Sequence, residues 1–302
     1  MTLAVQALHT QQSSIAERLG YPKDTKLLII HADDLGVAHS ENRASLKALE
    51  QGSVNSGSVM VPCPWFLEIA AYAKTHTTHD IGVHLTLTSE WKQYKWGPVL
   101  QHENTQSLTD ANGHFPDNVA DVVTNAEVMV LKKELEAQVR LALDAGIDVT
   151  HLDAHMGAVM ATPEFLKAYI EVGKAHQLPV LLVEAIAGLQ DPSVRTLLDA
   201  QDVLVDSVYS ASPEDYAQGM ASYYEQVLTN LGPGLNCILI HTAYDDAEMQ
   251  AVTIDHPNWG AAWRQADFDF FTSERCRELL QEQQIQLVTW REIRDEITRG
   301  GH

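Results

Sequence analysis

A leucine- and isoleucine-rich run leads directly into two adjacent carboxylates in the segment Leu27-Leu28-Ile29-Ile30-His31-Ala32-Asp33-Asp34-Leu35-Gly36. The run is typical of a buried β-strand, and a glycine soon after the acids indicates a turn. Because neighbouring residues of an extended chain point to opposite sides, one carboxylate could bind a metal while the other stays free as a base. A turn capped by an aspartate side chain is the structural alternative.

Similar runs recur along the chain and alternate with helical periodicity. We expect strands at Lys26–Ala32, Val54–Pro62, Asp80–Thr88, Val149–Asp153, Leu178–Val183, Val203–Tyr209, Asn236–His241 and Gln286–Val288. We expect helices at Ser40–Gln51, Pro64–Thr75, Pro163–Gln177, Pro213–Leu231 and Ser273–Gln284, and another that ends near Gly146 and follows the possible capping box Thr124-x-x-Glu127. About seven or eight mostly parallel strands predict an α/β fold with a single distorted (β/α) TIM-like barrel rather than two domains. We place the barrel at 26–298, after an N-terminal extension or helix at 1–25.

Composition excludes several other classes of protein. The 302 residues include 20 Lys and Arg against 41 Asp and Glu, a net charge of −21 that argues against a nucleic-acid partner. No apolar run approaches the roughly 18 residues of a membrane-spanning helix. Residues 1–6 do not resemble a secretory signal, so we expect a cytoplasmic protein without a membrane partner. Cys63, Cys237 and Cys276 lie far apart and are expected to be buried thiols.

Ionisable residues follow the other predicted strands as well. Alternation in Gly82–Thr88 puts His84 on a polar face that would point into the mouth of a barrel. In His151-Leu152-Asp153-Ala154-His155, the three polar side chains share one face if the segment is a strand. His241 ends a further apolar strand. Since strand ends converge in a barrel, this repetition predicts an active site.

Two histidines with carboxylates form the ligand set of a catalytic divalent ion that keeps positions open for water and substrate. The alternatives are a hydrogen-bonded structural histidine at His84, a capped strand end with a His–Asp hydrogen bond at His151–His155, and a buried hydrogen-bonded histidine at His241.

Three stretches without a clear period follow predicted strands and are expected to be binding loops: Ser89–Asn125, Glu184–Asp202 and Thr242–Thr272. The first and last are rich in aromatic residues that could stack on sugar rings or simply pack. These residues are Trp91, Tyr94, Trp96, Phe115, Tyr244, Trp259, Trp263, Phe268, Phe270 and Phe271.

Taken in order and spacing, the motifs at 31–36, 82–88 and 151–155 resemble those of the YdjC/ChbG-like carbohydrate deacetylases, over about Lys26 to Asp295. The resemblance implies a distorted (β/α) barrel, a divalent metal, hydrolysis of N-acetyl groups from sugars such as chitooligosaccharides, and a homodimer. Carried over motif by motif, it implies Asp33 as the base and Asp34, His84 and His155 as the metal ligands. His151 and Asp153 would then lie behind the ligands and orient a ligand or the substrate.

The family also tends to show an arginine followed three residues later by an acidic or polar residue, and Arg264 with Asp267 fits that pattern. The resemblance therefore implies that Arg264 orients or ionises Asp33, with a surface ion pair as the alternative. Two departures concern the sugar subsites: His31 and Leu35 stand where members commonly have Asn and Phe, and Met156-Gly157 replaces further histidines.

These expectations combine into metal-assisted amide hydrolysis that yields acetate and an amino sugar. The amine leaves poorly until it is protonated, so His241 is our candidate for the general acid. One carboxylate with two imidazoles suits Zn²⁺, Mn²⁺, Co²⁺ or Ni²⁺, whereas the resemblance implies Mg²⁺, so we expect one divalent ion, either Mg²⁺ or Zn²⁺. The alternatives are a metal-dependent amidase for another acylated amine and a non-catalytic sugar-binding barrel.

Overall fold

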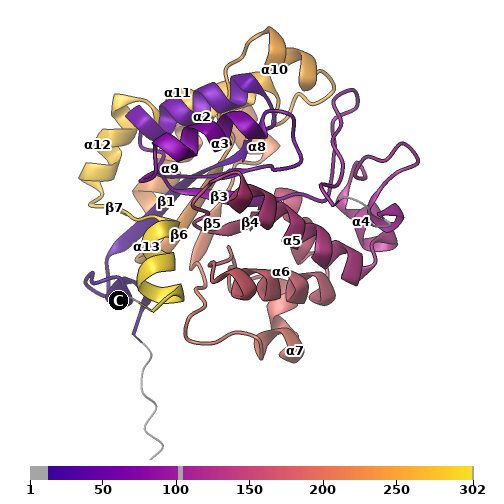
Figure 1. Ribbon diagram of the computed structural model, residues 1–302. Coiled ribbons are helices and arrows are strands. Elements are labelled where there is room, and N and C mark those ends of the chain that lie inside the picture. The colour runs from indigo at the N-terminus through magenta and orange to yellow at the C-terminus, as the bar shows by residue number, and fades with distance from the viewer. Residues whose placement is uncertain (1–12, 101–104, 301–302) are drawn as a thin grey trace, which may run out of the picture.

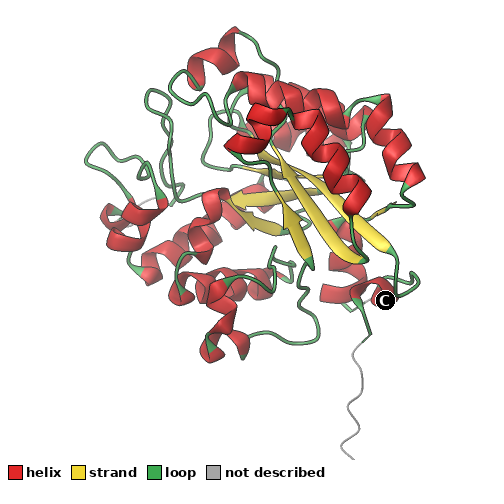
Figure 2. Ribbon diagram, turned by 180° about the vertical axis from the view of Figure 1, so that it is seen from behind, coloured by secondary structure: helices red, strands yellow, loops and turns green. Residues whose placement is uncertain are grey.

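The computed structural model describes residues 13–100 and 105–300 and has an α/β architecture, with seven strands hydrogen-bonded into one parallel sheet. The strands lie together at the centre of the molecule and helices surround them (Figure 2). Their order is β4-β3-β2-β1-β6-β5, with β7 also paired to β1. The strands are β1 (Lys26–Leu35), β2 (Ser56–Val59), β3 (Ile81–Leu85), β4 (Leu152–Ala154), β5 (Ser207–Tyr209), β6 (Gly234–Ile240) and β7 (Gln286–Leu287).

The sheet curls into a half-barrel, which confirms the predicted fold class. Two isolated parallel bridges, Leu152 to Val180 and Val183 to Val205, then link its two ends through the segment 178–183. That segment was predicted as a strand, but it forms only these single bridges and no regular strand within the described residues. The barrel is therefore distorted on this side, where only single bridges pair the backbone of neighbouring segments.

Helices connect successive strands and cover the outside of the sheet (Figure 1). The α-helices are α1 (Ile15–Arg18), α2 (His39–Gln51), α3 (Phe66–Thr75), α4 (Val119–Asn125), α5 (Val128–Asp144), α6 (Pro163–His176), α7 (Pro192–Arg195), α8 (Pro213–Gln218), α9 (Met220–Asn230), α10 (Ala247–Val252), α11 (Ala261–Phe271), α12 (Glu274–Glu282) and α13 (Trp290–Ile293). Shorter 3₁₀ turns cover Gln106–Leu108, His155–Met160 and Ala187–Gln190, and a π turn covers Arg294–Thr298.

Three details of the helix prediction were wrong. The expected capping box fails because Thr124 belongs to α4 and bonds the carbonyl of Ala120, while Glu127 caps α5 without a side-chain bond. The single helix expected at 213–231 is broken at Gly219, whose φ of 111° favours glycine. None of the three stretches expected to be loops is wholly a loop, because 89–125 contains α4, 184–202 contains α7, and 242–272 contains α10 and α11.

The core surrounds and supports the central strands. Every residue of β1 after Lys26 is buried, and Cys63, Cys237 and Cys276 are buried free thiols, as expected. Among the described residues, no helix has the length and apolar character needed to cross a membrane. The extension predicted at 1–25 lies partly outside the described residues, so the division at residue 26 stays a prediction.

The end of β1 departs from regular strand geometry. Its register with β2 shifts between Ala32 and Leu35, and Asp34 has a φ of 63°, in the left-handed region. A regular strand would point Asp33 and Asp34 to opposite faces. The irregularity instead lets both carboxylates line the same cavity.

Candidate metal centre and active site

A cavity of about 640 Å³ lies at the carboxyl ends of the strands. Its walls contain Asp33, Asp34, His84, His155, His241 and Arg264. A hollow of about 790 Å³ lies at the amino ends, beside α1 and Gly234, and its lining contains no histidine or cysteine. Binding sites in such barrels form at the carboxyl ends of the strands, so the smaller cavity with the histidines is the candidate site.

Three nitrogen and oxygen atoms converge at the floor of this cavity. Asp34 Oδ1 lies 3.4 Å from His84 Nε2 and 3.2 Å from His155 Nδ1, and the two nitrogens are 3.3 Å apart. Asp34 Oδ1 is buried and accepts no hydrogen bond from any described residue. A carboxylate oxygen without a donor that faces two imidazole nitrogens fits a cation, so these side chains could hold a metal ion.

Each of the two histidines is fixed from behind by a carboxylate, that of the buried Asp153 or that of the partly buried Glu90. His84 Nδ1 lies 2.7 Å from Asp153 Oδ2, and His155 Nε2 lies 3.0 Å from Glu90 Oε2. A carboxylate on the far nitrogen sets the tautomer and turns the other nitrogen toward the metal. Burial opposes the charged form of His155, but Glu90 and Asp34 raise its pKa to about 9. A cation that binds here would therefore displace protons.

Arg264 is buried on α11 and anchors Asp34 rather than Asp33. Its Nη2 donates to Asp34 Oδ2 over 2.8 Å, and its Nη1 donates to Glu41 Oε2 over 2.9 Å. Burial alone would raise the pKa of Asp34, yet the charge of Arg264 holds it well below its ordinary value. The expectation that Arg264 orients Asp33 was therefore wrong in its partner, and the surface ion pair with Asp267 is not formed.

Asp33 is held by a different group, His31. The Nε2 atom of His31 lies 3.1 Å from Asp33 Oδ1 and 3.2 Å from Asp153 Oδ2. Burial opposes the charge of His31, but hydrogen bonds and charges from Asp153 and Asp33 raise its pKa to about 9. A protonated imidazole thus lies between the candidate base and the carboxylate that orients His84.

His241 faces the same cavity from the residue after β6. Its Nε2 lies 4.0 Å from Asp33 Oδ2 and 3.9 Å from Asp34 Oδ2. Its backbone N–H donates to Asp267 Oδ2, and Asp267 also accepts a hydrogen bond from Tyr224. Burial lowers the pKa of His241, which makes its protonated form a stronger acid.

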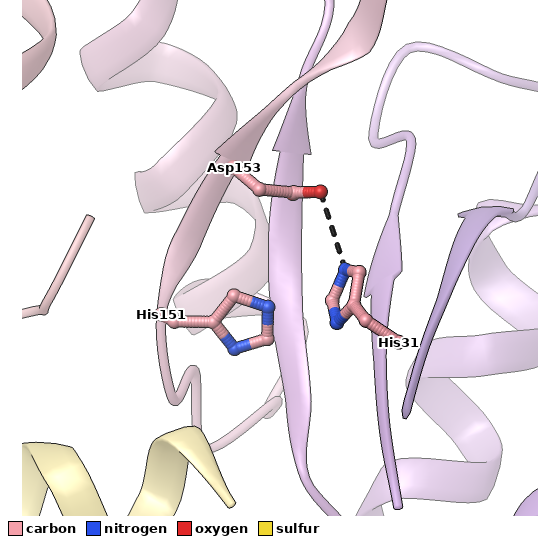
Figure 3. A group of neighbouring side chains, drawn as sticks. All are labelled: His31, His151 and Asp153. Atoms are coloured by element: carbon pink, nitrogen blue, oxygen red, sulfur yellow. Dashed lines mark hydrogen bonds and ion pairs between the residues drawn. The ribbon is translucent and has the colours of Figure 1, made fainter. Parts of the chain in front are cut away.

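A second group of histidines lies deeper in the barrel. Figure 3 shows the side chains of His31, His151 and Asp153 beside one another, with Asp153 joined to His31. The ring of His151 stacks on Trp290 with centroids 5.3 Å apart, and a Cβ atom on Gly82 would lie 2.5 Å from that ring. Asp153 contacts the candidate ligand His84, whereas His151 contacts Trp290 and Thr150, and the roles of these two residues behind the ligands stay a prediction.

Glu90 and Glu41 were not among the site residues predicted from the sequence. Glu90 continues the alternate spacing of His84, Thr86 and Thr88, so extending that pattern by two residues would have found it. Glu41 had no comparable local signal. It lies on α2 and meets Arg264 only through a contact across 223 residues of sequence.

Comparison with known proteins agrees with this fold and shows the family of the chain. Residues 27–282 match the family described as YdjC-like protein. A carbohydrate deacetylase of Thermus thermophilus is 32% identical over 292 residues, which cover 94% of this chain and 99% of that protein. A carbohydrate deacetylase of Brevibacillus brevis is 27% identical over 88% of this chain and 99% of its own. A crystal structure of a putative cellobiose-phosphate cleavage protein from Enterococcus faecalis has the same fold, with a TM-score of 0.71, 23% identity and coverage of 88% of this chain and 98% of its own.

Proposed function

The chain belongs to the YdjC-like protein family, and we propose that it is a metal-dependent carbohydrate deacetylase that hydrolyses N-acetyl groups of sugars to acetate and an amine. The observation that carries the proposal is the meeting of Asp34, His84 and His155 in an open cavity. Each histidine turns one nitrogen toward Asp34, because a carboxylate holds the other. This arrangement could hold a cation, and the relatives named carbohydrate deacetylases support the reaction class.

In this proposal Asp34, His84 and His155 hold one divalent ion. The bound ion supplies Lewis acidity toward the amide carbonyl and toward the attacking water. The nitrogen and oxygen ligand set favours Zn²⁺ or another transition ion, while Mg²⁺ remains the second candidate. A cytoplasmic location and a homodimer belong to the same proposal.

Asp33 accepts the proton of the attacking water, since its carboxylate lines the cavity beside the ligands. His31 steadies that carboxylate through its contact with Oδ1. As the tetrahedral intermediate collapses, the C–N bond breaks and the leaving nitrogen must gain a proton. His241 donates it, because its Nε2 faces both aspartates and the cavity. The products are acetate and a free amine.

The decisive experiment starts with elemental analysis of protein purified without added metal. The protein is then treated with a chelator and reloaded separately with Zn²⁺ and Mg²⁺, and acetate release is measured from N-acetylglucosamine, its β-1,4-linked dimer and a panel of acylated acyclic amines. We expect metal-dependent acetate release from the acetylated sugars. Release only from the acyclic amines would instead establish an amidase of another class, and sugar binding without any release would indicate a non-catalytic barrel.

A further inference from the structure

Two large apolar residues on the wall of the cavity have an uncommon backbone conformation. Met156 and Trp259 both line the cavity, and their φ angles of 52° and 56° lie in the left-handed region. Residues other than glycine rarely adopt the left-handed conformation, and it is sterically strained for bulky residues. Such strain persists where surrounding contacts hold it, and it concentrates at functional sites.

The contacts around Trp259 hold it at the rim. Arg264 Nε donates to the carbonyl of Trp259 over 2.7 Å, so the guanidinium that binds Asp34 also fixes this backbone. The indole stacks on Trp263 with centroids 5.0 Å apart, and Trp263 in turn stacks on Tyr216 at 4.7 Å. Within the described part of the chain, Trp263 is the one ring that packs on Trp259. Trp259 keeps 38% of its surface exposed.

Met156 is fixed in a comparable way. It directly follows the candidate ligand His155, and the buried hydroxyl of Thr88 donates to its sulfur over 3.3 Å. Its side chain nevertheless remains 49% exposed. A flexible thioether on a fixed backbone can adapt to the shape of an apolar ligand surface.

Most other aromatic residues of these loops cannot contact a ligand in the cavity, because their rings are buried in packing contacts. Trp91, Trp96, Phe115 and Trp263 are each at most 3% exposed. Trp259 is thus the cavity-lining aromatic ring with substantial free surface among the described residues.

We propose that Trp259 and Met156 are specificity-determining residues that bind the C–H face of a pyranose ring next to the reacting acetamide. This inference rests on the proposed deacetylase function and deepens it. An aromatic face and a thioether bury the apolar face of a sugar while its hydroxyls remain in water. A small acyclic acetamide has no ring face, so Trp259 and Met156 cannot bury a comparable apolar area of it.

The test separates ring binding from chemistry. An Asp33→Asn protein keeps the ligand set but lacks the candidate base, so ligands bind without turnover. In the zinc-loaded form of this protein, calorimetric titration with the β-1,4-linked dimer of N-acetylglucosamine is compared with titration by N-acetylethanolamine. Trp259→Gly is then introduced into the Asp33→Asn protein, because glycine fits the left-handed backbone. We expect dimer binding to weaken by about 10- to 30-fold, which corresponds to the loss of roughly one buried apolar side-chain surface.

The acyclic ligand should bind the Trp259→Gly protein with unchanged affinity. Trp259→Phe in place of glycine should restore most of the dimer affinity. Met156→Gly should weaken dimer binding by a smaller factor than Trp259→Gly. Trp65→Ala and Met129→Ala are matched controls, because Trp65 is 39% and Met129 is 69% exposed outside the cavity lining. Three results would overturn the inference. They are equal weakening of binding for both ligands, unchanged dimer affinity in Trp259→Gly, and no dimer binding by the Asp33→Asn protein. Dimer binding that depends on Trp259, without acetate release by the wild-type protein, would overturn the proposed function alone.

Discussion

The barrel contains two histidine clusters of similar composition at different depths. The upper cluster, Asp34, His84 and His155, lines the cavity, whereas the deep cluster, His31, His151 and Asp153, does not. Both bring three possible ligand atoms within 4.8 Å of one another. Residue types and proximity therefore do not distinguish them.

The clusters differ in their access to the cavity and in the partners of their histidines. In the deep cluster, His31 Nδ1 meets Ser56 at 2.9 Å and its Nε2 meets three oxygen atoms, so both nitrogens are occupied. His151 Nε2 and Asp153 Oδ1 of the same cluster are buried and have no hydrogen-bond partner among the described residues. In the upper cluster, carboxylates occupy only the far nitrogens, and the near ones face an oxygen that has no donor. Atoms without a hydrogen-bond partner therefore occur at both levels, and access to the cavity is what favours the upper cluster as the metal centre. In the deep cluster, His31 instead supports Asp33 and Asp153.

The largest difference between the two clusters should appear when one imidazole is removed from each. His84 and His151 are both buried, so His84→Ala and His151→Ala create similar cavities. We expect His84→Ala to lose bound metal and to lower acetate release by at least about three orders of magnitude, because the metal's several kcal/mol of transition-state stabilisation disappear. His151→Ala should keep its metal. Equal metal content in the two purified variants, measured by elemental analysis, would contradict the distinction.

His241 tests whether every histidine of the upper level is a ligand. We expect His241→Ala to retain full metal content and to lower turnover of an unactivated acetamide by about two to four orders of magnitude, as loss of a general acid does. Steady-state kinetics and metal analysis of the same preparation check this. Near-normal turnover would remove His241 from the mechanism, and loss of metal would make it a ligand.

The charge of the deep cluster should appear in the pH dependence of stability. The pKa of His31 is about 9 in the folded protein and about 6.5 when unfolded, so its contribution is complete below the lower value and is lost as pH rises through the higher one. We expect metal-free wild-type protein to lose up to about 3 kcal/mol more unfolding free energy between about pH 6 and 9 than His31→Asn does. Urea denaturation at both pH values measures this difference. Parallel pH profiles would show that His31 is not charged.

The smallest effect should come from the groups behind the histidines. Glu90→Gln removes the charge that orients His155, and we expect metal affinity to fall by about 10- to 100-fold. The matched change at the deep level is Ser56→Ala, which removes a partner of His31. Competition with a chromophoric chelator measures both affinities, and the serine variant should match the wild type. A comparable loss in Ser56→Ala would mean that the two levels act as one site.

Local sequence was sufficient for much of this protein. The alternation of apolar strands and helices predicted the parallel barrel, because periodicity and turn residues are properties of short segments. The same pattern placed His84, His151 and His241 at strand ends, and the motifs pointed to a family of metal-dependent deacetylases. The ligand assignment itself came from that resemblance and stays a prediction.

Only the tertiary structure decided how these side chains are used. The bulge at Asp34 turns both carboxylates into one cavity, and nothing in local spacing predicts a left-handed aspartate. Arg264 binds Asp34 and Glu41 instead of Asp33, and His84 and His155 line the cavity whereas His31 and His151 do not. These outcomes depend on hydrogen bonds and burial between segments separated by tens to hundreds of residues. The chain therefore encodes its candidate ligands locally, but their access to the cavity and their hydrogen-bond partners are decided only when the barrel brings distant segments together.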